Sequence, residues 1–152
     1  MKVDVFCASA VRDGEHFSQM GGCGVVLIAT DDHNRVQCRE FSYGLGGSSL
    51  ILCDIQASRI ALASIAPGMR SELVTIFTES MEVADLLTST RESHKFIHQT
   101  AELRRWGSYY KDLSVNVVTN VIGHMARAKE LAIVGLNKQR NSDSGTFLMY
   151  GG

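Results

Sequence analysis

The sequence lacks features that define several large protein classes. It has no run of the ~20 apolar residues that a membrane span needs, and the apolar stretch that follows Asp4 is too short for a secretory signal. Lys and Arg number 15 against 16 acidic residues. The resulting net charge of -1 gives no basic surplus of the kind that dedicated nucleic-acid binders carry. We therefore expect a protein that does not associate with membranes and has little non-specific affinity for phosphate backbones.

Cysteine and proline are also scarce. The four cysteines are Cys7, Cys23, Cys38 and Cys53, and no pair has the two-residue gap of a zinc knuckle or a redox motif. Each lies in an apolar context, which predicts buried free thiols in a reducing compartment, with the cytoplasm as the expected one. The single proline, Pro67, is followed by glycine and marks the end of a helix.

The remaining composition is that of one globular domain. The chain has 152 residues, of which 45% are hydrophobic and 20% charged, enough to fill a core. Apolar periodicity predicts five strands, at Val3–Ala10, Gly22–Ile28, Val36–Tyr43, Leu73–Thr78 and Val115–Val121. It predicts four helices, at Leu50–Ile65, Met81–Thr88, Ser93–Asp112 and Ala126–Arg140.

The order of these elements predicts the architecture. Three strands joined by short turns form an antiparallel meander, and strands separated by helices pair in parallel. The βββαβααβα order therefore predicts an α/β fold whose mixed five-stranded sheet has helices on both faces. The folded domain is expected over 1–140, with a Gly- and Ser-containing C-terminal tail over 141–152.

Six short motifs follow one another along these elements, at Val3–Ser9, Gly21–Leu27, Asp54–Leu62, Val74–Ser80, Ile122–His124 and Ala128–Ala132. In the same order, they resemble motifs of type 1 ribonuclease H. These are a first strand ending in Asp-Gly-Ser, a Gly-rich entry to strand two and a helix that begins with Glu. A strand ending in Thr-Asp-Ser, a Gly-His pair and Asp-Glu-Leu-Ala in the last helix follow. The resemblance spans nearly the whole chain and implies the ribonuclease H-like fold.

The resemblance also implies a chemistry, for which only part of the machinery is present. The family cuts the RNA strand of an RNA–DNA hybrid with two divalent cations held by four carboxylates. On that pattern the first-strand Asp falls on Ala8, and the helix Glu falls on Asp54. The strand-four Asp falls on Glu79, and the last-helix Asp falls on Lys129. Two remnant carboxylates are left, and a methyl group and an ammonium occupy the other two positions.

Lys129 has two interpretations. It either pairs with Asp54 or Glu79 and replaces the metals electrostatically, or it lies on a solvated helix face. No cofactor is expected if the site is inactive. If it is active, Asp54 and Glu79 would hold Mg or Mn in a reorganised site, helped by Asp4, Asp13 or Glu130.

The residues that would read the substrate are altered as well. Polar residues of the family that contact the hybrid are replaced by Leu50, Ile51, Leu52 and Met81. These four either pack inward or form a partner-binding patch for another protein or a second copy of the chain. The cationic side chains that could still bind an RNA–DNA hybrid are Arg104, Arg105 and Arg127.

The sequence thus predicts a ribonuclease H-like pseudoenzyme. Its expected function is that of a catalytically inactive module that binds a protein or a nucleic acid. The alternative is an active, divalent-metal-dependent ribonuclease H that cuts RNA in RNA–DNA hybrids with a reorganised site.

Overall fold

The computed structural model describes residues 1–13, 19–46, 49–88, 96–140 and 148–151. Its strands are β1 (Lys2–Asp13), β2 (Gln19–Thr30), β3 (Val36–Gly46), β4 (Leu73–Thr78), β5 (Asp112–Val117) and β6 (Leu148–Gly151). Its helices are α1 (Leu50–Ser64), the 3-10 helix η2 (Pro67–Met69), α2 (Met81–Thr88), α3 (Ile97–Ser108) and α4 (Gly123–Arg140). Among the described residues, no helix has the length and apolarity required to cross a membrane.

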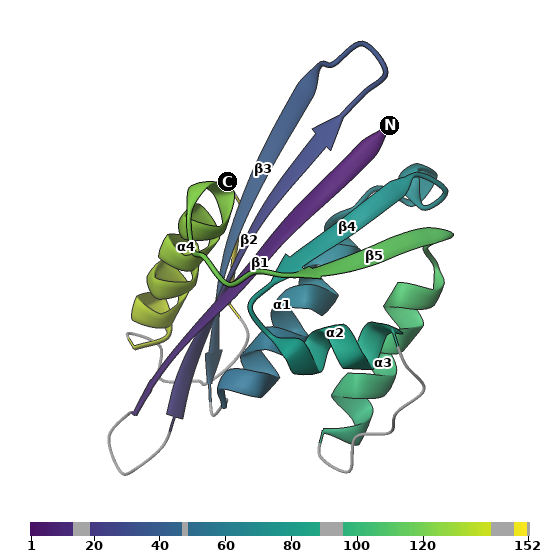
Figure 1. Ribbon diagram of the computed structural model, residues 1–152. Helices are drawn as coiled ribbons and strands as arrows, with labels where there is room; N and C mark the ends of the chain where they lie inside the picture. Colours follow the sequence, from purple (N-terminus) through teal and green to yellow (C-terminus); the bar gives the residue numbers. More distant parts are fainter. Residues whose placement is uncertain (14–18, 47–48, 89–95, 141–147, 152) are drawn as a thin grey trace.

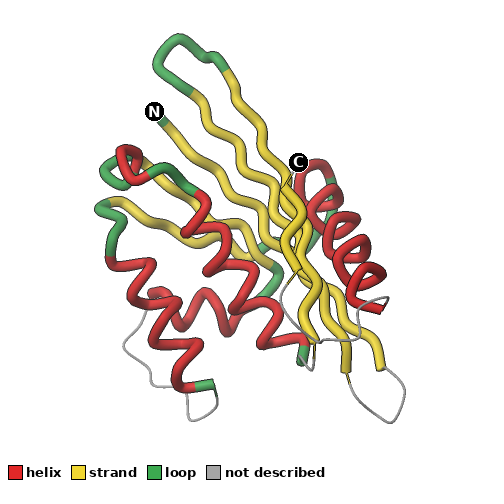
Figure 2. The backbone as a smooth tube through the Cα atoms, turned by 180° about the vertical axis from the view of Figure 1, so that it is seen from behind, coloured by secondary structure: helices red, strands yellow, loops and turns green. Residues whose placement is uncertain are grey.

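The strands form one mixed sheet in the order β5-β4-β1-β2-β3-β6. Strands β1, β2 and β3 pair antiparallel, and β4 pairs in parallel with both β1 and β5. Helices α1, α2 and α3 cover one face, and α4 covers part of the other (Figures 1 and 2). The predicted five-stranded sheet with helices on both faces is confirmed. Strand β6 adds a sixth, short strand from the predicted tail, antiparallel to β3.

Strand β1 lies at the centre and separates two cores. Its odd-numbered residues, such as Val5 and Cys7, belong to the larger core beneath α1, α2 and α3. Its residues Ala8 and Ala10 belong to the smaller core beneath α4. This alternation follows from the two-residue period of a strand, and it puts neighbouring residues of β1 in contact with different helices.

Three elements in the C-terminal half have boundaries that differ from the prediction. The fifth strand was expected over 115–121, but β5 spans Asp112–Val117 because its parallel register with β4 runs from Leu73–Asp112 to Thr78–Val117. Helix α3 ends at Ser108 rather than at 112, and residues 93–95 of that prediction lie outside the described residues. Helix α4 begins at Gly123, three residues earlier than expected, because the chain has already left the sheet after residue 118.

The cysteine prediction is confirmed for three residues and wrong for the fourth. Cys7, Cys23 and Cys53 are buried free thiols, whereas Cys38 is exposed. Burial raises the pKa of Cys7 to about 12, which keeps that thiol protonated and unreactive at neutral pH. Cys38 lies in the half of β3 that is exposed to solvent, before the strand becomes buried at Phe41. Its sequence neighbours, Gln37 and Arg39, are polar, so the prediction of burial was wrong for this cysteine.

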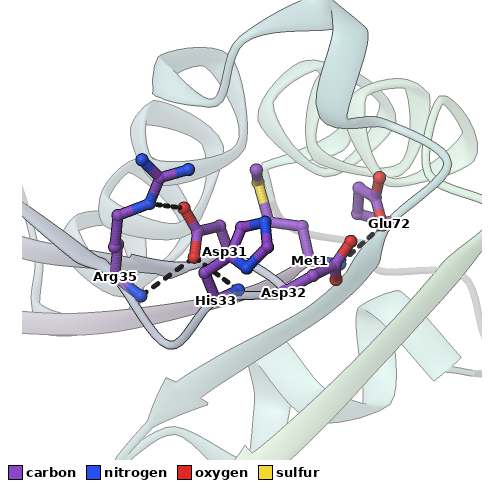
Figure 3. Close-up of polar contacts among 6 residues, drawn as sticks. All are labelled: Met1, Asp31, Asp32, His33, Arg35 and Glu72. Atoms are coloured by element: carbon purple, nitrogen blue, oxygen red, sulfur yellow. Dashed lines mark hydrogen bonds and ion pairs between the residues drawn. The ribbon is translucent and has the colours of Figure 1, made fainter.

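The predicted turn at 31–34 joins β2 to β3 at the end of the sheet away from the glycine-rich half of β2. The Asp31 carboxylate accepts hydrogen bonds from the His33 and Arg35 amides, each at 2.9 Å, and from Arg35 Nε at 2.7 Å (Figure 3). Asn34 adopts a φ of 59°, in the left-handed region that Asn tolerates better than most residues. The local side-chain bonds thus close the hairpin that the turn residues predicted.

Helix α4 approaches the sheet so closely that backbone meets backbone. Gly24 faces the Ala128 carbonyl oxygen, and a Cβ at this position would overlap that oxygen. Gly22 faces the Ala132 carbonyl in the same way, and Gly135 of the helix faces the backbone of Tyr43. The glycines therefore fix the distance between α4 and strands β2 and β3, because any larger residue needs a wider gap.

Replacing Gly24 by Ala is expected to lower the free energy of unfolding by about 1–3 kcal/mol, since overpacking forces the helix away from the sheet. Urea unfolding followed by circular dichroism measures the loss. Gly68→Ala is the control, because a Cβ there meets nothing within 4 Å. Equal unfolding midpoints for the Gly24→Ala variant and the wild type would show that the close approach does not limit α4 packing.

Candidate functional site

The candidate site lies where β1 extends past the end of β4. The pairing between these strands ends at Cys7 and Thr78, so the next two residues of β1, Ala8 and Ser9, have only β2 beside them in the register. Asp54 reaches this point from α1, and Lys129 reaches it from α4. Glu79 reaches it from the segment between β4 and α2. Four separate segments of the chain therefore contribute to one site.

A continuous line of polar contacts connects these residues. The Ser9 hydroxyl donates a hydrogen bond to the Asp54 carboxylate. The Lys129 ammonium donates to the Ser9 carbonyl oxygen at 2.6 Å, and its Nζ lies 3.8 Å from Glu79 Oε1. Lys129 thus pairs with Glu79 and is not a lysine on a solvated helix face. Its ammonium also satisfies a backbone carbonyl beyond the end of the β1–β4 ladder.

Ser9 is the member of the site that sequence reasoning missed. It stands where the Asp-Gly-Ser motif has its glycine, and its hydroxyl contacts Asp54, which is one methylene shorter than the glutamate of the motif. Ala8 contributes nothing polar, and its methyl group packs in the core beneath α4, a cluster that includes Val26 and Ala128. The sequence did contain a signal for this contact. Residue 9 is larger than the glycine of the motif and residue 54 is shorter than its glutamate, so Ser9 can fill the space that Asp54 leaves.

Asp54 is the electrostatically perturbed group of the site. Burial raises the pKa of its carboxyl group from 3.8 to about 6, because the charged form loses hydration. The Ser9 hydrogen bond and the Lys129 charge oppose this rise in pKa, while the negative charges of Glu79 and Glu82 add to it. Burial therefore outweighs the contacts that favour the charged form, and Asp54 titrates near pH 6.

The residues present do not fit a pair of divalent metal ions. Within the described residues, no group of three or more His, Cys, Asp and Glu side chains is placed to hold a metal. Hard cations of the magnesium type need several oxygen ligands, and Lys129 adds a positive charge where the family supplies a carboxylate. The predicted helpers are engaged elsewhere: Asp4 lies 3.5 Å from Lys2, and Glu130 lies 2.9 Å from Arg127. The side chain of the third helper, residue 13, lies outside the described residues.

The structure divides the predicted partner-binding patch. Leu50 and Met81 are exposed at the first residues of α1 and α2. Ile51 packs against the main core instead, and Leu52 is half-buried. Ile51 therefore packs inward, as one interpretation expected, and partner binding by the exposed Leu50 and Met81 stays a prediction.

The predicted nucleic-acid-binding arginines do not share a surface. Arg104 and Arg105 lie on α3, and Arg127 lies on α4, which covers the opposite face of the sheet (Figure 1). Arg127 binds Glu40 through Nε at 2.7 Å and Nη2 at 3.2 Å, and it also pairs with Glu130. Arg104 donates Nε to the Leu86 carbonyl at 2.9 Å. Arg105 lies 4.0 Å from Glu102, so all three arginines have partners within the chain.

Comparisons with known proteins identify the fold. The sequence matches no protein-family model and no curated protein. Among solved structures, the chain is similar to ribonuclease H1 from the halophilic archaeon Halobacterium salinarum NRC-1, with 18% identity and a TM-score of 0.71 over 91% of this chain and 99% of the other. It is also similar to LC11-RNase H1 in complex with RNA/DNA hybrid, with 16% identity and a TM-score of 0.72 over 90% and 97% of the two chains.

A third similar structure is LC9-RNase H1, described as a type 1 RNase H with the type 2 active-site motif. Its identity is 14% and its TM-score is 0.74, over 98% of this chain and 77% of the other. These similarities and the strand order define a three-layer α/β domain with a mixed sheet. The domain has the ribonuclease H-like fold, as its motifs predicted.

The raised pKa of Asp54 predicts that this residue lowers the free energy of unfolding in a pH-dependent way. Because the folded-state pKa of about 6 lies above the ordinary 3.8, the carboxyl does not destabilise the fold at pH values well below 3.8. Its destabilising effect grows as the pH rises from 3.8 to about 6 and stays constant at higher pH. Asp54→Asn is therefore expected to raise the free energy of unfolding by about 2–3 kcal/mol at pH 8 and to have little effect at pH 3.5. Urea titrations of both proteins across this range test the expectation, and a difference that does not vary with pH would contradict it.

Removing the ammonium of Lys129 should affect both of its partners. Lys129→Met leaves the Ser9 carbonyl without its donor, and we expect a loss of about 1–2 kcal/mol in the free energy of unfolding. The pair with the partly exposed Glu79 adds little because solvent screens it. The pKa of Asp54 should also rise, since the Lys129 charge lowers it.

Chemical denaturation and an NMR titration of the carboxyl carbons measure these two effects. Lys111→Met, which changes an exposed lysine outside the site, is the matched control. Wild-type stability of Lys129→Met at every pH, together with an unchanged Asp54 pKa, would exclude an electrostatic role for Lys129.

Proposed function

We propose that this chain is a ribonuclease H-like domain that does not cut nucleic acid and acts as an interaction module. The observation that carries the proposal is the position of the Lys129 ammonium, which bonds the Ser9 carbonyl and pairs with Glu79. A positive charge held beside the two remnant carboxylates repels a divalent cation and forms an ion pair with one of them. The site then serves to hold β1, β4 and α4 together.

The partner is proposed to be a protein or a second copy of the chain. Leu50 and Met81 are exposed beside the site, where the resembled family has polar contacts to its substrate. A nucleic-acid partner, including an RNA–DNA hybrid of the kind bound by LC11-RNase H1, has weaker support. The net charge of the chain is -1, and the predicted arginines are divided between two faces of the sheet. The three buried free thiols suit a reducing compartment such as the cytoplasm.

The second candidate function is that of an active metal-dependent ribonuclease H. Two observations favour it: Asp54 and Glu79 interact electrostatically across one site, and the fold is that of ribonucleases H1. Activity would require Mg or Mn to be held by these two carboxylates with further ligands, since Ala8 supplies none.

An assay of RNA cleavage in an RNA–DNA hybrid separates the two functions. With Mg or Mn present, we expect no cleavage by the wild-type chain above the level of Glu79→Gln. The variant removes a remnant acid but keeps the shape of its side chain, and circular dichroism verifies that both proteins are folded. Metal-dependent cleavage by the wild type that disappears in Glu79→Gln would contradict the inactive function and establish the second candidate.

A further inference from the structure

Four large apolar side chains border the remnant site and are exposed to solvent. We refer to them as the apolar rim. The exposed fraction is 49% for Leu50, 64% for Met81, 73% for Ile122 and 45% for Ile133. Single exposed apolar residues are ordinary on protein surfaces, but several around one site are typical of an interaction surface.

The geometry of the helices brings the rim to the polar contacts of the site. Leu50 lies four residues before Asp54 on α1, and Ile133 lies four residues after Lys129 on α4, so each shares a helix face with a site residue. Met81 follows Glu79 by two residues.

Ile122 lies directly before α4, and its carbonyl accepts the Ala126 amide at 3.3 Å. It lies four residues after Val118, whose amide donates to the carbonyl of Thr78, the residue before Glu79. The rim therefore has members from the segments that carry the acids, from the helix that carries the lysine and from the segment that leads into this helix.

The charge within the rim distinguishes between classes of partner. The charges of Glu79, Glu82 and Lys129 all act on Asp54, and Lys129 Nζ lies 3.8 Å from Glu79. Three carboxylates against one ammonium give the surface a negative potential when Asp54 is ionised. Phosphates are repelled by such a surface, whereas Lys and Arg side chains are attracted to it. The apolar rim adds hydrophobic surface, whose burial on binding stabilises a protein contact.

We infer that the apolar rim docks a segment of a partner protein that interleaves apolar side chains with Lys or Arg. This inference rests on the proposed non-catalytic function, because the partner covers the site at which a substrate would bind. The apolar side chains of the segment cover Met81 and Ile122, and its cations face the Glu79 and Glu82 carboxylates. The partner is thereby distinguished from nucleic acid and from acidic peptides.

Two synthetic peptides test the inference with the full chain. One is an amphipathic peptide of leucine and lysine about five helical turns long, and the other replaces each lysine with glutamate. Fluorescence anisotropy of labelled peptides should give an affinity for the lysine peptide at least about tenfold higher than for the glutamate peptide, and it should weaken as salt increases. Amide shifts in NMR spectra should centre on Met81 and Ile122.

A matched pair of variants locates the contact. Met81→Lys combined with Ile122→Lys should weaken binding of the lysine peptide by about tenfold or more, because it removes two apolar anchors and adds repulsion. Val36→Lys should leave binding unchanged. Its exposed fraction of 61% is close to that of Met81. Its register through Thr30 and Lys2 places it roughly 20 Å along the sheet from Ser9.

Three results would overturn the inference: no binding of the lysine peptide at about 1 mM, equal binding of both peptides, or equal losses in the rim and control variants. Binding of an RNA–DNA hybrid to the chain alone, with amide shifts at Met81 and Ile122, would also overturn it and would assign the surface to nucleic acid. These results are independent of the cleavage assay. A chain that fails here but cuts no hybrid keeps its non-catalytic function, whereas a chain that cuts hybrid loses that function whatever it binds.

Discussion

The close approach of α4 to strands β2 and β3 is the constraint on which the site depends. Gly22 and Gly24 let the helix backbone reach the sheet, and Gly135 does the same from the helix side. This packing places Lys129 where its ammonium meets the Ser9 carbonyl and the Glu79 carboxylate. A helix held farther from the sheet would carry the lysine into solvent, and the site would keep its acids without their counter-charge.

The site combines a loss of ligands with a gain of internal contacts. Ala8 packs beneath α4, Ser9 bonds Asp54, and Lys129 bonds the backbone of β1. Charged groups that hold metals in the resembled family here hold secondary-structure elements to one another. A fold specifies where such groups meet, but the chemistry at that point depends on the individual side chains. The ribonuclease H-like fold and the proposed non-catalytic function are therefore consistent.

Apolar periodicity was sufficient to predict the architecture, and it failed where tertiary pairing decides a boundary. Strand β4 and helix α2 were predicted to the residue, because Leu73–Thr78 is a short apolar run and Ser80 bonds the Val83 amide at the start of the helix. Strand β5 was displaced by three residues at its start, since its register with β4 determines where it begins and ends. The exposure of Cys38 was missed because the helices do not cover that part of β3.

The sequence by itself determined the order of elements and the mixed sheet, and the family resemblance predicted that Ala8 and Lys129 stand at two carboxylate positions. It could do so because periodicity and residue identity are local properties of the chain. Only the tertiary structure decided that Lys129 pairs with Glu79, that Ser9 bonds Asp54 and that Leu50, Met81, Ile122 and Ile133 are exposed. Each of these depends on distances between segments far apart in the sequence, and packing of the helices against the sheet sets those distances.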